Sequence, residues 1–342
     1  MKARRAAWTA CAAFVLAVTG AAAAPAAETA ISFSLDRPID GTSAPFLLPL
    51  DRGWYRSAGV NVSVSPGRDM IEPITRVAAG DADMALADFN ALIKYRDANP
   101  KAPIKAVFML YNRPAYAVIG RKSRGVAVPS DLEGKKLGAP AADPAAAQWP
   151  IFAKANGIDI AKVKIENIAK LVREPMLAAG QVDAVTGQSY SVFIDLKDKG
   201  VPVNDITVMQ MADYGVSLYG QAIIVNTAFA AKNPEAIAGF LRAFLKGLKA
   251  SVASPATAVE AVLTRNDALR KDVESERLAM VIANDFITPE VKANGYGVID
   301  DVRFDRAIEQ LAIAYRFKDT KPKPADVFDA SYLPPAAERA VR

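Results

Sequence analysis

The feature that most constrains the fold is a short sequence that occurs twice, 100 residues apart. Residues 78–85 read A-A-G-D-A-D-M-A, and residues 178–185 read A-A-G-Q-V-D-A-V. Each copy predicts the end of a helix, a glycine that closes it, and a short apolar strand. The repeat favours two similar lobes, although helix–glycine–strand units also occur singly in any α/β protein.

Each of these two strands runs into a polar or aromatic loop. The first loop is Asp88-Phe89-Asn90 and the second is Gln188-Ser189-Tyr190. Ligands of open α/β sheets bind at the carboxyl ends of the strands. The loops therefore supply candidate ligand-binding residues: Asp88, Phe89, Asn90, Gln188 and Tyr190.

Short β-rich runs alternate with helical patterns along the rest of the chain. The runs that predict strands are 31–35, 60–64, 104–110, 116–119 and 222–225. Asn233-Pro234-Glu235 predicts a helix start, and Asp143-Pro144 predicts another. The C-terminal stretches 278–286 and 307–315 are expected as helices in the core of the first lobe. This alternation predicts an α/β fold, and 342 residues are too many for one ordinary core.

Composition excludes several classes of function. The sequence has no His and a single Cys, which removes His-dependent triads, HExxH zinc sites, disulfide frameworks and four-cysteine metal sites. Past the N-terminus, no apolar run approaches the roughly 20 residues that span a bilayer, so stable membrane insertion is not expected. We therefore expect no catalytic residue, no metal and no cofactor.

The N-terminus predicts a secretory signal peptide over residues 1–26. A basic start, Met1 to Arg5, leads into an apolar stretch and then into small residues. The alternative is an Ala-rich first helix of the fold. Cys11 has no lipobox-like sequence around it, so no lipid anchor is expected. Cleavage predicts a periplasmic protein.

Most of the basic excess belongs to this predicted leader. The formal net charge of +5 comes from 42 basic and 37 acidic residues, and removing Lys2, Arg4 and Arg5 reduces it to +2. No basic stripe remains, so nucleic-acid binding has no support.

An ordered set of motifs resembles the solute-binding proteins of ABC importers of the nitrate/sulfonate/taurine type, a group that also includes thiamine-pyrimidine synthase-like proteins. The motifs span most of the predicted mature chain: APFLLPLDRGWY (44–55), AGVNV (58–62), GDAD (80–83), PSDLEGKKLG (129–138), ANGID (155–159), AGQVDA (179–184) and NPE (233–235).

This resemblance implies a periplasmic binding protein type II fold, in which two lobes, each a mixed sheet flanked by helices, are joined by two crossover strands. The crossovers are placed near residues 111–113 and 218–221. Lobe I then comprises 27–112 and 219–342, and lobe II comprises 113–218. The implied function is capture of a small solute between the lobes and its delivery to an ABC permease with a cytoplasmic ATPase. A monomer is expected.

Helix N-termini and loop aromatics supply the remaining candidates. Ser43, Asp88 and Asp143 stand at predicted helix starts, where they either cap the helix or contact ligand oxygens and donors. Phe46, Phe89, Tyr111, Tyr190 and Tyr214 lie near predicted strand ends or first helical turns. They either stack on a flat ligand or pack in the core, and core packing is favoured for Phe46.

Charged candidates are few. Arg37 and Arg113 would pair with a carboxylate or sulfonate, or form salt bridges between lobes. Asp213 favours a ligand with amino or N–H donors, as do Asp36 and Asp40. Acids and arginines together favour a heteroaromatic or zwitterionic organic solute.

Two alternatives stay open. The resemblance implies that the thiamine-pyrimidine synthase branch carries an active-site His, a Lys that holds pyridoxal phosphate, and a Cys-rich motif. The sequence has no His, and its single Cys lies in the predicted leader. Neither the active-site His nor the Cys-rich motif is therefore present, which disfavours an enzyme. A ligand-binding sensor module would have the same cleft as a transport protein, and the sequence does not separate the two.

Overall fold

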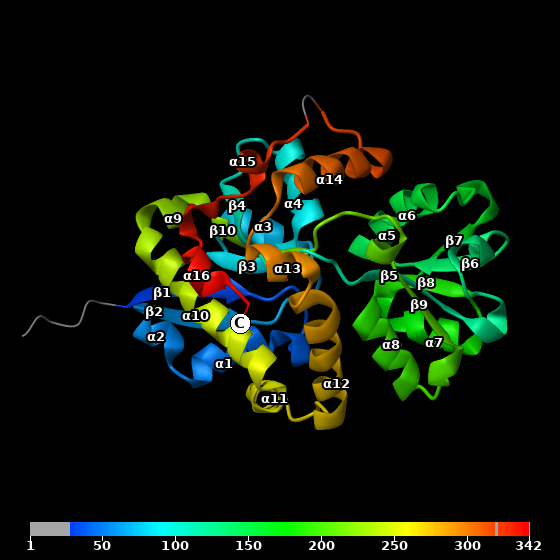
Figure 1. Ribbon diagram of the computed structural model, residues 1–342, viewed down its shortest axis with the longest axis horizontal. Coiled ribbons are helices and arrows are strands. Elements are labelled where there is room, and N and C mark those ends of the chain that lie inside the picture. The colour runs from blue at the N-terminus through cyan, green and yellow to red at the C-terminus, as the bar shows by residue number, and fades with distance from the viewer. Residues whose placement is uncertain (1–27, 319–320, 342) are drawn as a thin grey trace, which may run out of the picture.

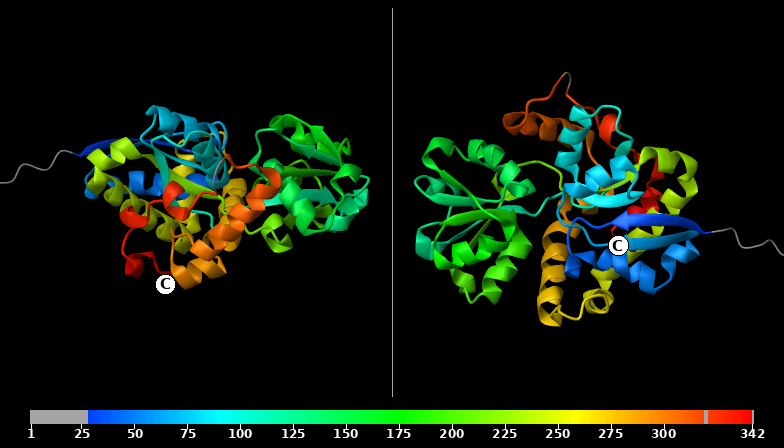
Figure 2. Two further views of the ribbon diagram at one scale, coloured as in Figure 1. Left: turned by 90° about the horizontal axis from the view of Figure 1, so that it is seen from above. Right: turned by 180° about the vertical axis from the view of Figure 1, so that it is seen from behind.

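The computed structural model describes residues 28–318 and 321–341. The predicted signal peptide lies outside the described residues. Figure 1 shows two sheets, each with its own helices, lying side by side. We call them lobe I, built on the sheet β2-β1-β3-β10-β4, and lobe II, built on the sheet β7-β6-β8-β5-β9. The views in Figure 2 agree that the lobes meet along one side of each.

The two sheets have the same topology. In lobe I, β1 is parallel to β2 and β3, while β10 is antiparallel to β3 and β4. In lobe II, β6 is parallel to β7 and β8, while β5 is antiparallel to β8 and β9. The strands are β1 (Thr29–Ser34), β2 (Val60–Ser65), β3 (Met84–Asp88), β4 (Ile104–Met109), β5 (Tyr116–Arg121), β6 (Lys136–Ala139), β7 (Lys164–Asn167), β8 (Ala184–Gln188), β9 (Ile206–Gln210) and β10 (Gln221–Asn226). The predicted α/β class with two mixed sheets is confirmed, and every predicted strand is present.

Helices cover both sheets. Those that follow lobe I strands are α1 (Ala44–Asp51), α2 (Trp54–Ser57), α3 (Glu72–Ala79), α4 (Phe89–Ala98), α9 (Thr227–Lys232), α10 (Pro234–Ala253) and α11 (Pro255–Leu263). Those of lobe II are α5 (Pro144–Ala147), α6 (Trp149–Ala155), α7 (Arg173–Ala179) and α8 (Ser189–Asp198). The C-terminal helices are α12 (Lys271–Val281), continued by a π-helix (Ile282–Phe286), α13 (Pro289–Asn294), α14 (Asp301–Ala314), α15 (Pro324–Val327) and α16 (Ala336–Arg339).

The repeated sequence occupies equivalent places in the two lobes. Gly80 caps the C-terminus of α3 and Gly180 caps that of α7, with φ of 84° and 72°, a left-handed conformation that favours glycine. β3 and β8, which follow, are the central strands of their sheets. The repeat is therefore one structural unit used twice.

The aspartate shared by the two copies has one role in both lobes. The Asp83 carboxylate accepts from the backbone N–H of Ser32 at 2.8 Å, and that of Asp183 accepts from the backbone N–H of Lys136 at 2.9 Å. The backbone N–H groups of Asp83 and Asp183 donate in turn to the carbonyls of Ser32 and Lys136. Each aspartate thus ties the start of a central strand to its parallel neighbour.

Two segments pass between the lobes, residues 110–115 and 215–220. They pair with each other, because the Gly220 N–H donates to the Tyr111 carbonyl at 2.8 Å and the Tyr111 N–H donates to the Gln221 carbonyl at 3.0 Å. The predicted lobe boundaries at 112/113 and 218/219 fall inside these segments and stay predictions.

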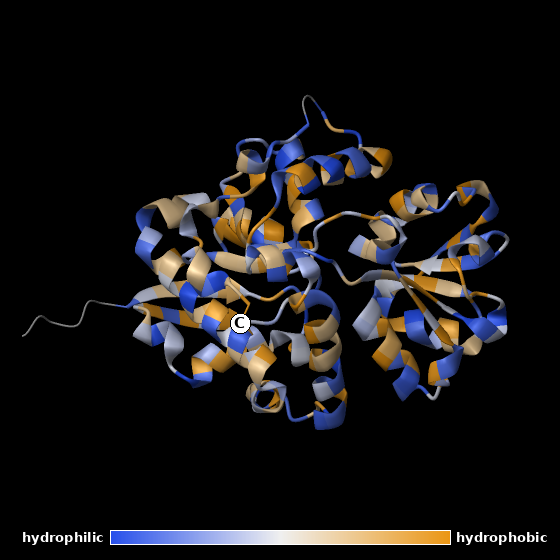
Figure 3. Cartoon of the chain, viewed as in Figure 1, coloured by the Kyte–Doolittle hydropathy of each residue, from blue (hydrophilic) through white to orange (hydrophobic). Residues whose placement is uncertain are grey.

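The lobe I core gathers aromatic rings from distant parts of the chain. Phe46 of α1 stacks on Phe33 of β1 with centroids 5.0 Å apart, and it packs on Phe244 of α10 at 4.5 Å. α10 begins at the helix start predicted from Asn233-Pro234-Glu235, and it buries an apolar stripe here: Ile237, Phe240, Leu241, Phe244, Leu245 and Leu248. Figure 3 shows hydrophobic and hydrophilic residues mixed along the helices that cover the sheets, as expected of helices with one buried face.

The C-terminal helix α14 contacts both lobes. Phe304 and Leu311 are buried against lobe I residues such as Phe89, but α14 also packs on α6 of lobe II. The Gln310 side chain accepts from the backbone N–H of Ser217 at 2.7 Å. α14 is therefore more than the lobe I core helix that the sequence predicted.

No helix in the described part of the chain is long and apolar enough to cross a membrane.

Candidate functional site

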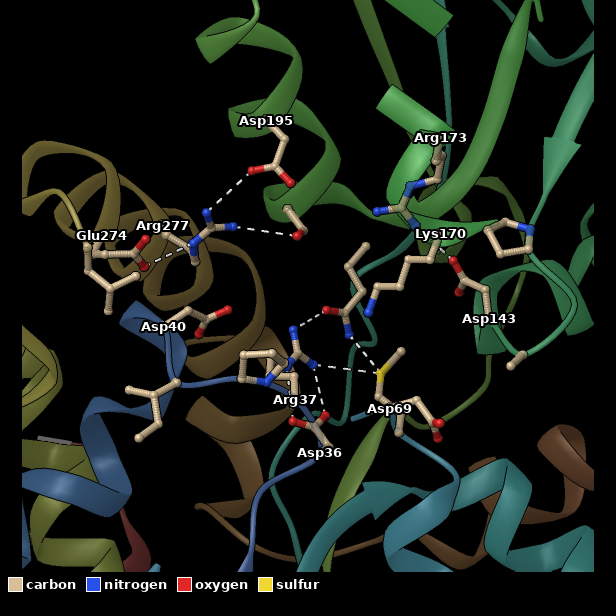
Figure 4. A pocket seen from close by; sticks show the side chains of 18 of the residues that line it. Asp36, Arg37, Asp40, Asp69, Asp143, Lys170, Arg173, Asp195, Glu274 and Arg277 are labelled. Atoms are coloured by element: carbon tan, nitrogen blue, oxygen red, sulfur yellow. Dashed lines mark hydrogen bonds and ion pairs between the residues drawn. The ribbon is translucent and has the colours of Figure 1, made fainter. Parts of the chain in front are cut away.

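A cavity of about 340 Å³ lies between the lobes. Figure 4 shows side chains entering it from several separate elements. Lobe I lines it with the segment after β1, the loop after β2 and the region around α12. Lobe II lines it with the loops before α5 and α7 and with the start of α8. The charged lining residues are Asp36, Arg37, Asp40, Asp69, Asp143, Lys170, Arg173, Asp195, Glu274 and Arg277.

Arg37 connects the two lobes at this cavity. Its guanidinium donates to both carboxylate oxygens of Asp36, with Nε 3.0 Å and Nη2 2.8 Å from them. Nη1 donates to Oε1 of Gln188 and to the hydroxyl of Tyr190, both in lobe II. Burial by itself lowers the pKa of Arg37, but the Asp36 carboxylate and Tyr190 more than offset this, so the pKa lies well above its usual value. Arg37 stays charged and holds two lobe II side chains.

A buried ion-pair cluster forms the lobe II wall. Arg173, at the start of α7, pairs with Asp143 at 3.0 Å and with Glu174 at 2.6 Å. Asp143 also caps α5 by accepting from the backbone N–H of Ala145 at 2.9 Å. All three charged side chains are less than a tenth exposed, so the cluster is held rigidly. Asp143 therefore caps a helix and lines the cavity at once.

α12 contributes a second ion-pair cluster. Arg277 pairs with Glu274 at 3.1 Å and with Asp195 of α8 at 3.5 Å. Glu274 accepts from the backbone N–H of Gly41 at 2.6 Å, and burial raises its pKa. Figure 4 shows Arg277 directed toward Asp195 across the gap between the lobes. This cluster is a second contact between the lobes.

Lys170 is exposed, whereas the three arginines of the cavity are buried. It lies in an exposed segment just before α7, and Figure 4 shows its side chain extending into the cavity. Lys170 therefore brings a positive charge from lobe II into the cavity.

The predicted loop Asp88-Phe89-Asn90 does not line this cavity. Asp88 caps α4 through the backbone N–H of Ala91 at 2.7 Å and accepts from the Tyr116 hydroxyl of lobe II. Burial raises the pKa of Asp88 to about 6, although its hydrogen bond from Tyr116 acts in the opposite direction. Asn90 donates to the Tyr219 carbonyl at 2.6 Å, and the Phe89 ring is buried. The three residues join the lobes beside the crossover segments.

The candidates in or beside the crossover segments also lie outside the cavity: Tyr111, Arg113, Asp213 and Tyr214. The Tyr111 ring stacks on Phe286 with centroids 5.5 Å apart. Arg113 forms an ion pair with Asp213, and Tyr214 packs edge-on against Phe152 at 5.9 Å. Asp213 follows β9 of lobe II, so this ion pair joins a crossover segment to lobe II and is not the salt bridge between the lobes that the sequence offered as an interpretation.

Ser43 and Phe46, the remaining candidates from the sequence, do not line the cavity either. The Ser43 hydroxyl accepts from the backbone N–H of Asp40 at 3.3 Å, and Phe46 lies in the lobe I core. The structure thus brings Arg37, Asp143 and Gln188 to the cavity, with Tyr190 directly behind Arg37. Sequence reasoning missed Met70 and most of the other polar lining residues, which include Asp69, Lys170, Arg173, Ser191, Asp195, Asn266, Glu274 and Arg277.

Among the described residues, no aromatic side chain lines the cavity, and no group of three or more acidic or sulfur side chains is arranged to hold a metal ion. The arrangement offers paired charges, amides and short apolar side chains. It is suited to reversible binding.

Comparison with known proteins finds several relatives. The chain is 26% identical over 242 residues to the formylaminopyrimidine-binding protein of Halalkalibacterium halodurans, which covers 68% of this chain and 71% of that one. It is 25% identical over 215 residues to the riboflavin-binding protein RibY of Chloroflexus aurantiacus, covering 62% and 59% of the two chains. It is also 25% identical over 231 residues to 4-amino-5-hydroxymethyl-2-methylpyrimidine phosphate synthase of Aspergillus parasiticus, covering 64% and 65%.

A solved structure with a similar fold is the periplasmic aliphatic sulphonate binding protein SsuA from Escherichia coli. Its TM-score is 0.66 at 13% identity, and the match covers 83% of this chain and 86% of that one. The fold is that of the periplasmic binding proteins. The model of the NMT1/THI5-like family matches residues 41–258, which include the cavity-lining loop after β2 and the cavity-lining segments of lobe II, but neither residues 36–40 nor α12 and the loop before it. The chain belongs to the NMT1/THI5-like family.

Proposed function

We propose that this protein is the extracytoplasmic substrate-binding component of an ABC importer. It holds a small polar organic solute between its lobes and delivers it to the permease. The observation that carries the proposal is the cavity itself, which is lined from both lobes and bridged at Arg37 and Arg277. A ligand that contacts both lobes favours the closed form by those additional contacts, and a permease can recognise that form.

The charge of the lining indicates the class of solute. Six acidic side chains (Asp36, Asp40, Asp69, Asp143, Asp195 and Glu274) face four basic ones (Arg37, Lys170, Arg173 and Arg277). Three of the four basic groups already pair with acids of the cavity. A simple anion would meet a net negative wall, whereas a heteroaromatic or zwitterionic solute with N–H donors would find acceptors. Two relatives are named for their ligands, a formylaminopyrimidine and riboflavin; both ligands are nitrogen heterocycles and support this class.

Isothermal titration calorimetry with the purified mature protein tests the proposal. The panel contains riboflavin, formylaminopyrimidine, an aminopyrimidine without the formyl group, and taurine as the small sulfonate. We expect dissociation constants in the micromolar range or below for at least one heterocycle, and no binding of taurine. Tight binding of taurine alone would contradict the assigned class, and failure of every solute, including those released from the denatured protein and identified by mass spectrometry, would contradict the proposed function.

A synthase is the second candidate, because relatives of similar identity carry that activity. The branch would need an active-site histidine, and the sequence has none. The single cysteine is Cys11, within the predicted leader. Absorbance of bound pyridoxal phosphate in the purified protein, or formation of a pyrimidine phosphate, would favour the synthase. We expect neither.

A further inference from the structure

The sulfur of Met70 occupies an unusual position on the cavity wall. Met70 lies in the loop between β2 and α3, is 7% exposed, and is anchored by its carbonyl, which accepts from the Asp88 N–H at 2.9 Å. Three side-chain N–H donors point at its Sδ: Nε2 of Gln188 at 3.2 Å, Nη2 of Arg37 at 3.7 Å, and Nε2 of Gln221.

The direction of the Gln188 donor is fixed by its neighbours. Its Oε1 accepts from Arg37 Nη1 and from the Tyr190 hydroxyl at 2.6 Å. With the oxygen engaged on that side, the NH₂ group must face Met70. Gln221 is the first residue of β10, where the second crossover segment enters the lobe I sheet. The donors therefore come from lobe I, from lobe II and from the crossover.

A thioether is a poor partner for three donors. Methionine sulfur accepts hydrogen bonds weakly, and a buried amide or guanidinium N–H that lacks a good acceptor is costly. A carbonyl oxygen in the same place would satisfy the donors much better. Since Asp36 neutralises Arg37, the group of donors has no net charge, which favours a neutral carbonyl over an anion.

We propose that the Met70 side chain occupies a subsite built to bind a carbonyl oxygen of the ligand. The side chain swings out when ligand enters, and Gln188, Gln221 and Arg37 then donate to that oxygen. Gln221 becomes a specificity-determining residue. This inference rests on the proposed function and narrows its solute class to molecules with a carbonyl group.

The donor group is tested first without any ligand, by comparing the melting temperatures of Met70→Leu and Met70→Gln. Leu matches the volume of Met but has no acceptor, whereas the Gln oxygen can accept from the donors. We expect Met70→Gln to melt above Met70→Leu. The matched pair Met209→Leu and Met209→Gln, at a fully buried core position of β9, should show the reverse order. If the Leu variant melted above the Gln variant at Met70 as well, Met70 would be an ordinary packing residue and the inference would be overturned.

The ligand is tested next with two probes that differ in one carbonyl, formylaminopyrimidine and the aminopyrimidine without the formyl group. We expect Gln221→Leu to weaken binding of the formylated probe about tenfold and to change the other by about twofold or less. Equal losses for both would overturn the subsite while leaving the binding function intact. If neither probe nor riboflavin binds the unmodified protein, the proposed solute class fails, and the order of melting temperatures still decides the donor group.

Discussion

Nη1 of Arg37 donates a hydrogen bond to Oε1 of Gln188, across 151 positions of the sequence and across the boundary between the lobes. The same nitrogen also contacts the Tyr190 hydroxyl. A lobe I side chain thus holds two lobe II side chains at the end of β8 and the start of α8. This contact helps to hold the two lobes together.

The first prediction concerns the ion pair behind that contact. Arg37→Gln leaves the Asp36 carboxylate, which is 1% exposed, without its cationic partner. Breaking a buried pair from one side destabilises strongly, so the free energy of unfolding should fall by about 3 kcal/mol. Urea denaturation measures the change. The control Arg68→Gln removes an exposed pair with Glu72 and should cost about 0.5 kcal/mol or less. Equal losses for the two variants would show that Arg37 carries no special energetic role.

The second prediction is a pH dependence set by Asp88. Burial raises its pKa from 3.8 to about 6, so between these values the folded protein binds a proton that the unfolded chain has released. The free energy of unfolding therefore falls as pH rises from about 4 to about 6 and is lowest above that range. The two-unit difference corresponds to about 3 kcal/mol as an upper bound.

Asp88→Asn tests this assignment, because the amide resembles the neutral acid and Asn is still a good N-cap. Urea denaturation at several values between pH 4 and pH 7 should show a smaller fall in stability for the variant than for the unmodified protein. Parallel curves for the two proteins would assign the pH dependence to other groups.

The third prediction concerns the repeated aspartates. Asp83→Ala and Asp183→Ala each remove a carboxylate that accepts from the backbone of a neighbouring strand. Each should lower the free energy of unfolding by about 1 kcal/mol, and the two losses should add because the sites lie in different lobes. The exposed neighbour Asp81→Ala should change stability by about 0.5 kcal/mol or less. Thermal unfolding of the unmodified protein, the three single variants and the Asp83→Ala/Asp183→Ala double variant measures these changes. A control as damaging as the other two single variants would contradict the shared role.

Much of the fold follows from local patterns. The repeat at residues 78–85 and 178–185 places two central strands correctly, because helix ends, left-handed glycines and apolar runs are properties of short segments. Gln188 follows from the rule that ligands lie at the carboxyl ends of strands, and Arg37 follows from its charge; both line the cavity.

The rest of the cavity depends on long-range packing. Glu274 and Arg277 reach it from α12, which lies far along the chain and carries no site motif. Asp88 also stands at a strand end, yet Tyr116 of the other lobe covers it. Whether a residue at a strand end lines the cavity or is covered depends on how the two lobes pack against each other. A sequence rule for one sheet does not contain that information.

The last prediction concerns the exposed edge of the contact between lobes, where α8 faces α12. Lys197 pairs with Glu276 at 2.6 Å, and Arg270, just before α12, pairs with Asp198 at 2.6 Å. These pairs lie in solvent, so added salt screens them, and the ligand-free protein should open as salt rises from about 0.01 M to about 1 M. Small-angle scattering should then give a larger radius of gyration.

Lys197→Glu should open the protein at low salt, because two acids would face each other. The double variant Lys197→Glu/Glu276→Lys should restore closure, since the pair is re-formed with its charges exchanged. A Lys197→Glu variant as compact as the unmodified protein would show that the lobes are held by the buried contacts at Arg37 and Asp88, and not by this edge.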